Sequence, residues 1–178
     1  KKEVLGDLKF DNDYVPVEDY DLWSRLLTKT KFHNIPESLL NYRQHNTNIS
    51  KTKIDNVNRS VRKVKINQLG HLEISNSDPK IDAYLNAVSL KKRLSPEEII
   101  EAINTSKYLV SQNAKIKYFN QELFEKHINR VLIRSIRNAA SYNKSFYRFL
   151  KNDANSLFNK INLLDRTIIY FKSLKQEK

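Results

Sequence analysis

The sequence predicts a mainly α-helical protein with a short α/β portion at its amino end. Over most of residues 51–178, apolar residues recur every three or four positions, which is the spacing of one buried helix face. Only two Gly and four Pro occur among the 178 residues, so little interrupts regular helices. Residues 1–50 instead combine one short helical pattern with extended stretches. We therefore expect an α/β portion at residues 1–50 and a multi-helix bundle or array at residues 51–178.

The distribution of charge divides the chain at the same place. Residues 1–50 carry seven Lys/Arg against eight Asp/Glu, a net charge of −1, whereas residues 51–178 carry 25 against 12, a net charge of +13. A basic carboxyl part favours an anionic partner, such as a lipid surface, a polyanionic glycan or nucleic acid; the alternative is a solvated, Lys-rich surface. The basic residues are scattered and match no known nucleic-acid motif, which argues against nucleic acid.

The composition also limits the class of protein. Cys is absent, which excludes disulfides and thiolate metal sites and fits a reducing compartment. No run approaches 18 apolar residues and no signal peptide is recognisable, so we expect a cytoplasmic protein or one at the inner face of the membrane. Met is absent too, and we interpret the chain as a fragment of a longer protein.

A short helix with an acidic start stands out near the amino end. We expect a regular element that Gly6 ends and then a loop over residues 11–16. Apolar residues at positions 22, 23, 26 and 27 predict a helix over residues 19–28, with Trp23 on its buried face. Glu18 and Asp19 stand at its start, where free backbone N–H groups and the helix dipole favour negative charge. They have a purely structural interpretation as well, as a helix cap and as dipole-complementing charges.

An extended segment follows this helix. Pro36 disfavours helix, and the residues from Ser38 to Tyr42 predict a short strand in which Leu39, Leu40 and Tyr42 pack.

Several elements of residues 1–50 resemble one known family in order and in spacing. They are Phe-Asp at positions 10–11, Glu-Asp-Tyr-Asp-Leu-Trp at 18–23, Ile-Pro-Glu at 35–37 and Tyr-Arg-x-His at 42–45. Together they resemble the carboxyl half of the catalytic domain of bacterial-type family-2 glycosyltransferases, which are inverting enzymes with the GT-A fold. The family's nucleotide-binding βαβ half, with its Asp-x-Asp motif, does not occur in this sequence. Asp11-Asn12-Asp13 lies on the wrong side of the acidic helix to be that motif, and we expect a turn there.

The resemblance implies a role for each matching residue. Asp19 would be the base that takes the proton from the acceptor hydroxyl, and Glu18 would orient the site or the acceptor. Tyr42, Arg43 and His45 would belong to the substrate- and donor-binding segment, where Arg43 would contact the donor diphosphate and His45 the diphosphate or its metal ion. The alternative for Arg43 and His45 is a pair on a surface loop. Trp23 is an alternative candidate for a platform on which a sugar ring stacks.

The resemblance also implies an activity for the full-length protein. That enzyme would transfer a sugar from a nucleotide-sugar donor to a glycan or lipid-linked acceptor, as in surface polysaccharide synthesis, with Mg²⁺ or Mn²⁺ as the metal ion. Without the donor-binding half, we expect this fragment to be inactive and to bind neither metal nor nucleotide-sugar. The alternative function is a basic helical module, for binding or as a scaffold, that docks on a polyanion or a membrane surface. The sequence leaves the sugar, the acceptor and the oligomeric state open.

The first helices of residues 51–178 have clear boundaries. An apolar stripe begins at Ile54 and continues to Leu72, with Gly70 near the end of that helix. Pro79 suits the first position of the next helix. Ser95 and Glu98 then form a Ser-x-x-Glu capping box around Pro96, which predicts another helix start.

Three more helices follow to the carboxyl end. We expect one of about 20 residues ending near positions 141–143, one over residues 146–161, and a last short helix capped by Asp165. The helix pairs are spaced as in a repeat array, although no residue pattern repeats. Basic residues at 130, 134 and 137 form a stripe on one helix, and those at 172, 175 and 178 flank Tyr170-Phe171. This terminal helix is suited to an anionic bilayer; the alternative is an amphipathic packing helix with a solvated face.

Overall fold

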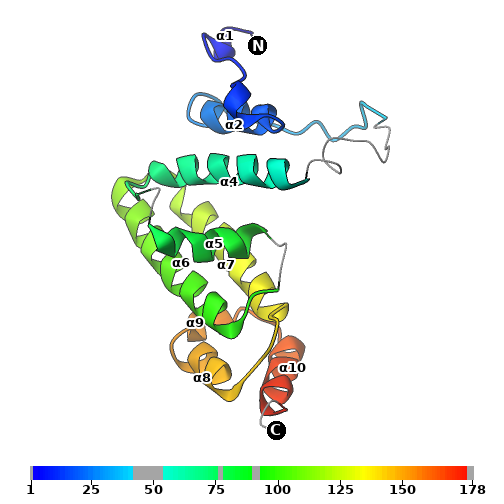
Figure 1. The fold of residues 1–178 in the computed structure, drawn as a ribbon, viewed down its shortest axis with the longest axis vertical. Coiled ribbons are helices and arrows are strands. Elements are labelled where there is room, and N and C mark those ends of the chain that lie inside the picture. Colours follow the sequence, from blue (N-terminus) through cyan, green and yellow to red (C-terminus); the bar gives the residue numbers. More distant parts are fainter. Residues whose placement is uncertain (1, 42–53, 76–77, 90–92, 176–178) are drawn as a thin grey trace. The chain divides into compact units, whose positions relative to one another are not determined.

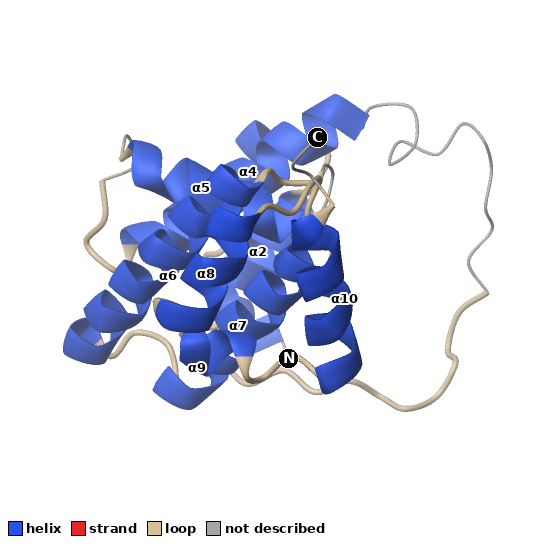
Figure 2. Ribbon diagram, turned by 90° about the horizontal axis from the view of Figure 1, so that it is seen from below, coloured by secondary structure: helices blue, strands red, loops and turns tan. Residues whose placement is uncertain are grey.

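The computed structural model describes residues 2–41, 54–75, 78–89 and 93–175. Within these ranges it is mainly helical and contains no strand, as Figure 2 shows, so the prediction of a mainly α-helical protein is confirmed. The chain divides into two compact units, residues 1–70 and residues 71–178. Each unit has its own set of packed helices, and each is described by itself.

Unit 1 is built around one long helix. It contains α1 (Lys2–Leu5), the 3₁₀ helix η1 (Asn12–Tyr14), α2 (Glu18–Leu26) and α4 (Ile54–Gly70), labelled in Figure 1. Helix α4 packs against both η1 and α2. The core of this unit consists of Tyr14, Val17 and Val64, with Val57 and Val61 packed against it. Because these valines follow at helical spacing, the stripe predicted from the sequence is the face of α4 that packs on the amino-terminal segment.

Tyr14 is the residue through which α4 holds η1. The ammonium group of Lys63 lies 4.3 Å from the centroid of the Tyr14 ring, and the side-chain amide of Asn67 donates a hydrogen bond to the Tyr14 hydroxyl. Ser60 also donates to the carbonyl oxygen of Val15 at 3.3 Å. Helix α4 therefore belongs with unit 1, so the change of composition at Ser50 and the division of the structure at Gly70 do not coincide.

The strand predicted from Ser38 is wrong for the residues that the structure describes. Residues 38–41 form no strand, and the side chains of Leu39 and Leu40 are 69% and 77% exposed rather than packed. A strand needs a neighbouring strand to satisfy its backbone N–H and C=O groups, and the described residues offer none. Tyr42, which was predicted to end this strand, lies outside the described residues.

Unit 2 is a bundle of six helices within the described residues, with α6 near its centre. The helices are α5 (Pro79–Ser89), α6 (Pro96–Ile116), α7 (Gln121–Arg137), α8 (Lys144–Asn152), α9 (Asn155–Phe158) and α10 (Leu163–Leu174). Helix α6 packs beside α5, α7 and α8, and α8 in turn contacts α9 and α10 (Figure 1). The most deeply buried apolar side chains of this unit are Leu72, Ile99, Ile103, Leu109, Ile136, Phe146 and Leu150.

The predicted start of α6 is confirmed in detail. The hydroxyl of Ser95 accepts a hydrogen bond from the Glu98 backbone N–H at 3.2 Å, and the Glu98 carboxylate accepts one from the Ser95 N–H at 2.8 Å. Pro96 occupies the first turn, where its missing N–H costs nothing. Pro79 likewise begins α5, as predicted.

Two helix boundaries in unit 2 differ from the predictions because of local side-chain contacts. Helix α7 ends at Arg137, before the predicted end at positions 141–143, because the Tyr142 hydroxyl donates to the carbonyl oxygens of Ile136 and Arg137 at 2.9 and 2.8 Å. The predicted helix over residues 146–161 is two helices, α8 and α9, separated at Asp153–Ala154.

The cap of the last helix also differs from the prediction. Asn162 caps α10: its side-chain oxygen accepts the Asp165 backbone N–H at 2.8 Å, and its amide donates to the Asp165 carboxylate at 2.7 Å. Asp165 therefore lies inside the helix and pairs with the capping residue, whereas the sequence predicted that it would be the cap itself.

Candidate functional site

An ion pair within α2, buried at its Asp21 end, connects the helix that carries the candidate base to the segment before it. The Asp21 side chain is only 4% exposed and lies 2.8 Å from Nη2 of Arg25, one helical turn later. Arg25 also donates through Nε to Asp21 at 2.9 Å and through Nη2 to the carbonyl oxygen of Lys9 at 2.7 Å. One guanidinium thus links α2 to the segment that precedes η1. The sequence signal for this pair is the i, i+4 spacing of Asp21 and Arg25.

Asp19 lies in the first turn of α2 with its carboxylate exposed to solvent. Its Oδ1 accepts the backbone N–H of Tyr20 at 2.7 Å. The N-cap of the helix is Val17, which makes no side-chain capping bond, so the interpretation of Asp19 as the cap is wrong. The carboxylate lies in the first turn of the helix, at the positive end of the helix dipole.

Glu18, the first residue of α2, has one carboxylate oxygen that contacts neither water nor a donor. Its Oε2 is buried and has no hydrogen-bond partner among the described residues, although the residue as a whole is only half-buried. A buried carboxylate oxygen ordinarily has a donor, because removing it from water is otherwise costly. This oxygen of Glu18 is turned away from solvent at the start of α2.

Trp23 lies on the exposed side of α2, and the expectation that it is buried is wrong. Its side chain is 53% exposed, because the face of α2 that packs inward carries Asp21, Leu22, Ser24 and Leu26 instead. Asp19 and Trp23 are four residues apart, so their side chains are neighbours along one helix face. The indole ring and the carboxylate together present an apolar surface beside a proton acceptor.

Tyr20 adds a hydroxyl at the same end of the helix. Burial raises the pKa of its phenol above the usual value of 10.0, so the hydroxyl stays protonated near neutral pH and remains a hydrogen-bond donor.

The other residues implied by the resemblance cannot be placed. Tyr42, Arg43 and His45 lie outside the described residues. In the part of the chain that the structure describes, no group of three or more His, Cys, Asp or Glu side chains is arranged to hold a metal ion. The described carboxylates of α2 therefore offer no donor set for the divalent ion that the resemblance implies.

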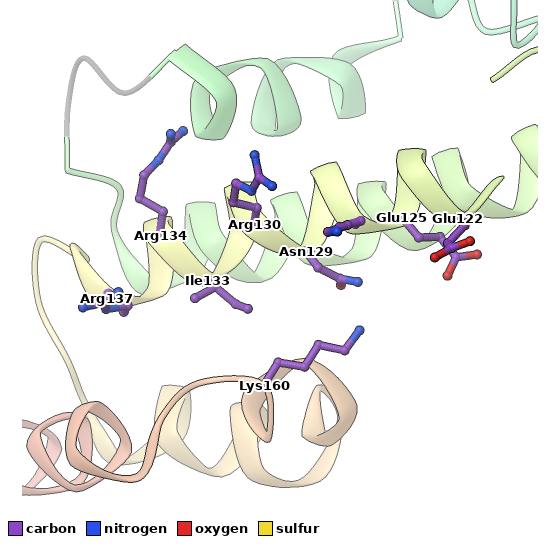
Figure 3. Close-up of a pocket in the computed structure, with 9 residues that line it drawn as sticks. Glu122, Glu125, Asn129, Arg130, Ile133, Arg134, Arg137 and Lys160 are labelled. Carbon is purple, nitrogen blue, oxygen red and sulfur yellow. The ribbon is translucent and has the colours of Figure 1, made fainter. Parts of the chain in front are cut away.

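Unit 2 contains a second candidate site, an open groove of about 690 Å³ along α7. Figure 3 shows Arg130 and Arg134 next to each other on one side of α7, Arg137 at its carboxyl end, and Lys160 across the opening from Asn129 and Ile133. The remaining lining residues are Glu122, Glu125 and Lys126. The stripe of arginines predicted from the sequence therefore lines this groove, whereas Lys160, two residues beyond the end of α9, faces Asn129 and Ile133.

The groove has an excess of positive charge at its arginine end. Five of its lining residues are basic and two are acidic. Arg137 is paired with Asp165 at 2.8 Å, whereas the Nε of Arg134 is buried without a hydrogen-bond partner among the described residues. Guanidinium groups bind phosphate and carboxylate oxygens through two parallel hydrogen bonds. This arrangement can hold an anion with more than one charged group.

Comparisons with protein-family models, with curated proteins and with solved structures find no match for this chain.

Proposed function

We propose that this chain contributes the base and part of the acceptor wall to an inverting glycosyltransferase, which transfers a sugar from a nucleotide-sugar to a glycan or lipid-linked hydroxyl. The observation that carries the proposal is the exposed carboxylate of Asp19 on a helix anchored through Asp21 and Arg25. It is supported by the ordered resemblance of residues 1–50 to the carboxyl half of family-2 catalytic domains.

The chemistry needs only one proton acceptor from this chain. The acceptor oxygen attacks the anomeric carbon while its proton passes to the Asp19 carboxylate. The bond from the anomeric carbon to the diphosphate breaks, and its electron pair leaves with the nucleoside diphosphate. Glu18 accepts a hydrogen bond from a second acceptor hydroxyl, and Trp23 packs against the apolar face of the sugar ring. A base that is fixed in place is worth about 10²–10⁴ in rate.

The apolar surface of residues 27–40 agrees with this proposal. Large apolar side chains are exposed there at five positions: Leu27, Phe32, Ile35, Leu39 and Leu40. Contiguous apolar surface of this kind is typical of a face that packs against another part of a protein. In the proposed enzyme, this face packs on the donor-binding half, where residues 38–42 gain the neighbouring strand that they need.

Sugar transfer tests the proposal directly. A protein that joins these 178 residues to a nucleotide-sugar-binding half is expected to release nucleoside diphosphate and glycosylate an acceptor. The 178 residues alone are expected to do neither. The proposal is contradicted if the isolated chain transfers sugar, or if the joined protein binds a nucleotide-sugar and hydrolyses or transfers nothing.

A second function is favoured by the groove of α7, and it concerns unit 2 alone. We propose that the groove binds a multiply phosphorylated ligand. Along a helix, Arg130 and Arg134 are about 6 Å apart and Arg137 lies about 4.5 Å further on, at 1.5 Å per residue. In a linear polyphosphate, successive phosphate groups contact successive arginines of this row. Lys160 adds positive charge from the opposite side of the groove.

Titration calorimetry with tripolyphosphate tests the groove. The double variant Arg130→Gln/Arg134→Gln is expected to weaken binding at least tenfold, and more at low salt than at high salt. The matched control is Arg148→Gln, because Arg148 is exposed on α8 and does not line the groove. Equal affinities of the double variant and the control would reject the groove as the site.

A further inference from the structure

Helix α10 exposes an unusual number of large apolar side chains. Leu163 and Leu164 are 72% and 71% exposed, and Phe171 is 57% exposed. Ile168, Tyr170 and Leu174 are each more than a third exposed as well. On this 12-residue helix only Ile169 and Ser173 are buried. Exposed apolar residues on a protein surface are usually scattered singly. Several of them on one helix indicate a surface that binds another molecule.

These exposed apolar side chains fall into two rows along α10. Leu164, Ile168 and Phe171 follow at i, i+4 and i+7, which places them in one row along the helix. Leu163, Tyr170 and Leu174 form a second row beside the first, at i, i+7 and i+11. With a rise of 1.5 Å per residue, the two rows extend about 16 Å along α10.

Basic side chains border these rows. Lys172 lies in the last turn and Lys175 is the C-cap, both exposed, and Arg166 lies in the first half of the helix. The Lys172 ammonium lies 5.2 Å from the centroid of the Tyr142 ring, so it stands where α10 meets the rest of the bundle. Residues 144–178 carry eight Lys/Arg against three Asp/Glu, a net charge of +5. The surroundings of the apolar rows are thus positive.

We propose that α10 docks on an anionic lipid bilayer. Its two apolar rows enter the boundary between headgroups and acyl chains, and its basic residues contact the headgroup phosphates. The positive charge decides between this occupant and a second copy of the chain, because two copies facing each other through α10 bring like charges together. No described helix has the length and apolar character needed to cross a bilayer. With 12 residues and exposed apolar rows along its length, α10 is suited to lie parallel to the bilayer surface.

Membrane docking is independent of the proposed transferase activity. Vesicle binding tests the first and sugar transfer the second, so either proposal can fail while the other stands.

Co-sedimentation of the full chain with vesicles tests the apolar rows. We expect binding to phosphatidylcholine vesicles that contain 30% phosphatidylglycerol and at least tenfold weaker binding to pure phosphatidylcholine. The variant Ile168→Ser/Phe171→Ser is expected to lose at least tenfold in affinity for the anionic vesicles. The control Leu123→Ser removes an apolar side chain that is 64% exposed on α7, and it is expected to bind unchanged. All three of these side chains are more than a third exposed, and circular dichroism checks that each variant is folded.

A second pair of variants tests the charges. Lys175→Gln is expected to weaken binding to anionic vesicles about fivefold, the factor that corresponds to about 1 kcal/mol per basic residue near the surface. Lys115→Gln changes an exposed lysine on α6 and is expected to have no effect.

A fluorescent variant reports insertion itself. Phe171→Trp is expected to show a blue-shifted emission on anionic vesicles, whereas Leu123→Trp is not. The proposal is overturned if neither vesicle type binds the chain, or if both bind it equally. It is also overturned if Ile168→Ser/Phe171→Ser abolishes a concentration-dependent dimer seen by sedimentation and leaves vesicle binding unchanged.

Discussion

The carboxylate of Asp21 is buried within α2 and paired with Arg25, whose Nη2 lies 2.8 Å away. The same guanidinium donates to the carbonyl oxygen of Lys9 at 2.7 Å, so the pair connects α2 to the preceding segment. A buried carboxylate depends on its partner, because an unpaired charge away from water is costly. The position of the acidic first turn of α2 therefore depends on Arg25.

Removing this partner is expected to destabilise unit 1. Arg25→Ala should lower the free energy of unfolding by about 2 kcal/mol, because it leaves the Asp21 carboxylate buried without its donors. Trp23 is the single Trp of the chain and lies on α2, so its fluorescence during urea unfolding reports on this unit. Arg59→Ala, an exposed change on α4, should stay within about 0.5 kcal/mol of the parent. An equal loss in both variants would show that the ion pair contributes no stability.

A buried asparagine is expected to hold α6 and α7 together in unit 2. Asn113 is fully buried; its amide donates to the Phe119 carbonyl at 3.0 Å and to Gln121 at 2.7 Å, and its oxygen accepts the Phe119 N–H at 2.8 Å. Asn113→Ala leaves these groups unpaired and should cost about 3 kcal/mol in urea unfolding followed by circular dichroism. Asn104→Ala, on the exposed side of α6, should cost less than about 1 kcal/mol. If Asn104→Ala lowered the free energy of unfolding as much as Asn113→Ala, the hydrogen bonds of Asn113 would not be what stabilises the contact between α6 and α7.

The hydroxyl of Tyr142 predicts a pH dependence of stability. It donates to the last carbonyls of α7, so Tyr142→Phe should cost about 1 kcal/mol near neutral pH. Burial raises the pKa of this phenol above 10.0; the Ala139 backbone and Arg93 oppose the rise, and Asp165 adds to it. Because the folded-state pKa is the higher one, the stabilisation is complete below pH 10 and is lost as the pH rises through the folded-state pKa.

The free energy of unfolding, measured at pH 7 and above pH 10, checks the direction of this pH dependence. The stability advantage of the parent over Tyr142→Phe should shrink at the higher pH. If the stability advantage of the parent over Tyr142→Phe grew above pH 10, the raised pKa of Tyr142 in the folded state would be contradicted.

The features that could be predicted from the sequence are those determined within a few residues. The capping box of Ser95 and Glu98 and the helix starts at Pro79 and Pro96 were predicted because each depends on neighbours in the same turn. The cap at Asn162 was missed because Asp165 is an equally good capping residue, and only the backbone geometry distinguishes them.

The predictions that were wrong concern features that depend on residues distant in the sequence. Residues 38–41 have the composition of a strand, but a strand forms only where another strand can pair with it. Trp23 fits the apolar pattern of α2, yet the buried face is shifted because the Asp21–Arg25 pair lies inward and the indole outward. In the candidate site, the exposure of Asp19 and the unpaired oxygen of Glu18 are tertiary properties that no local pattern contains.

Asp19 is the residue on which the transferase proposal depends, and a single-turnover rate measures its role. In the protein that joins these residues to a nucleotide-sugar-binding half, Asp19→Asn should lower the rate of sugar transfer by about 10²–10⁴ and leave donor affinity nearly unchanged. Asp7→Asn, an exposed carboxylate outside α2, should keep the parent rate. A rate for Asp19→Asn within about threefold of the parent would contradict the assignment of Asp19 as the base.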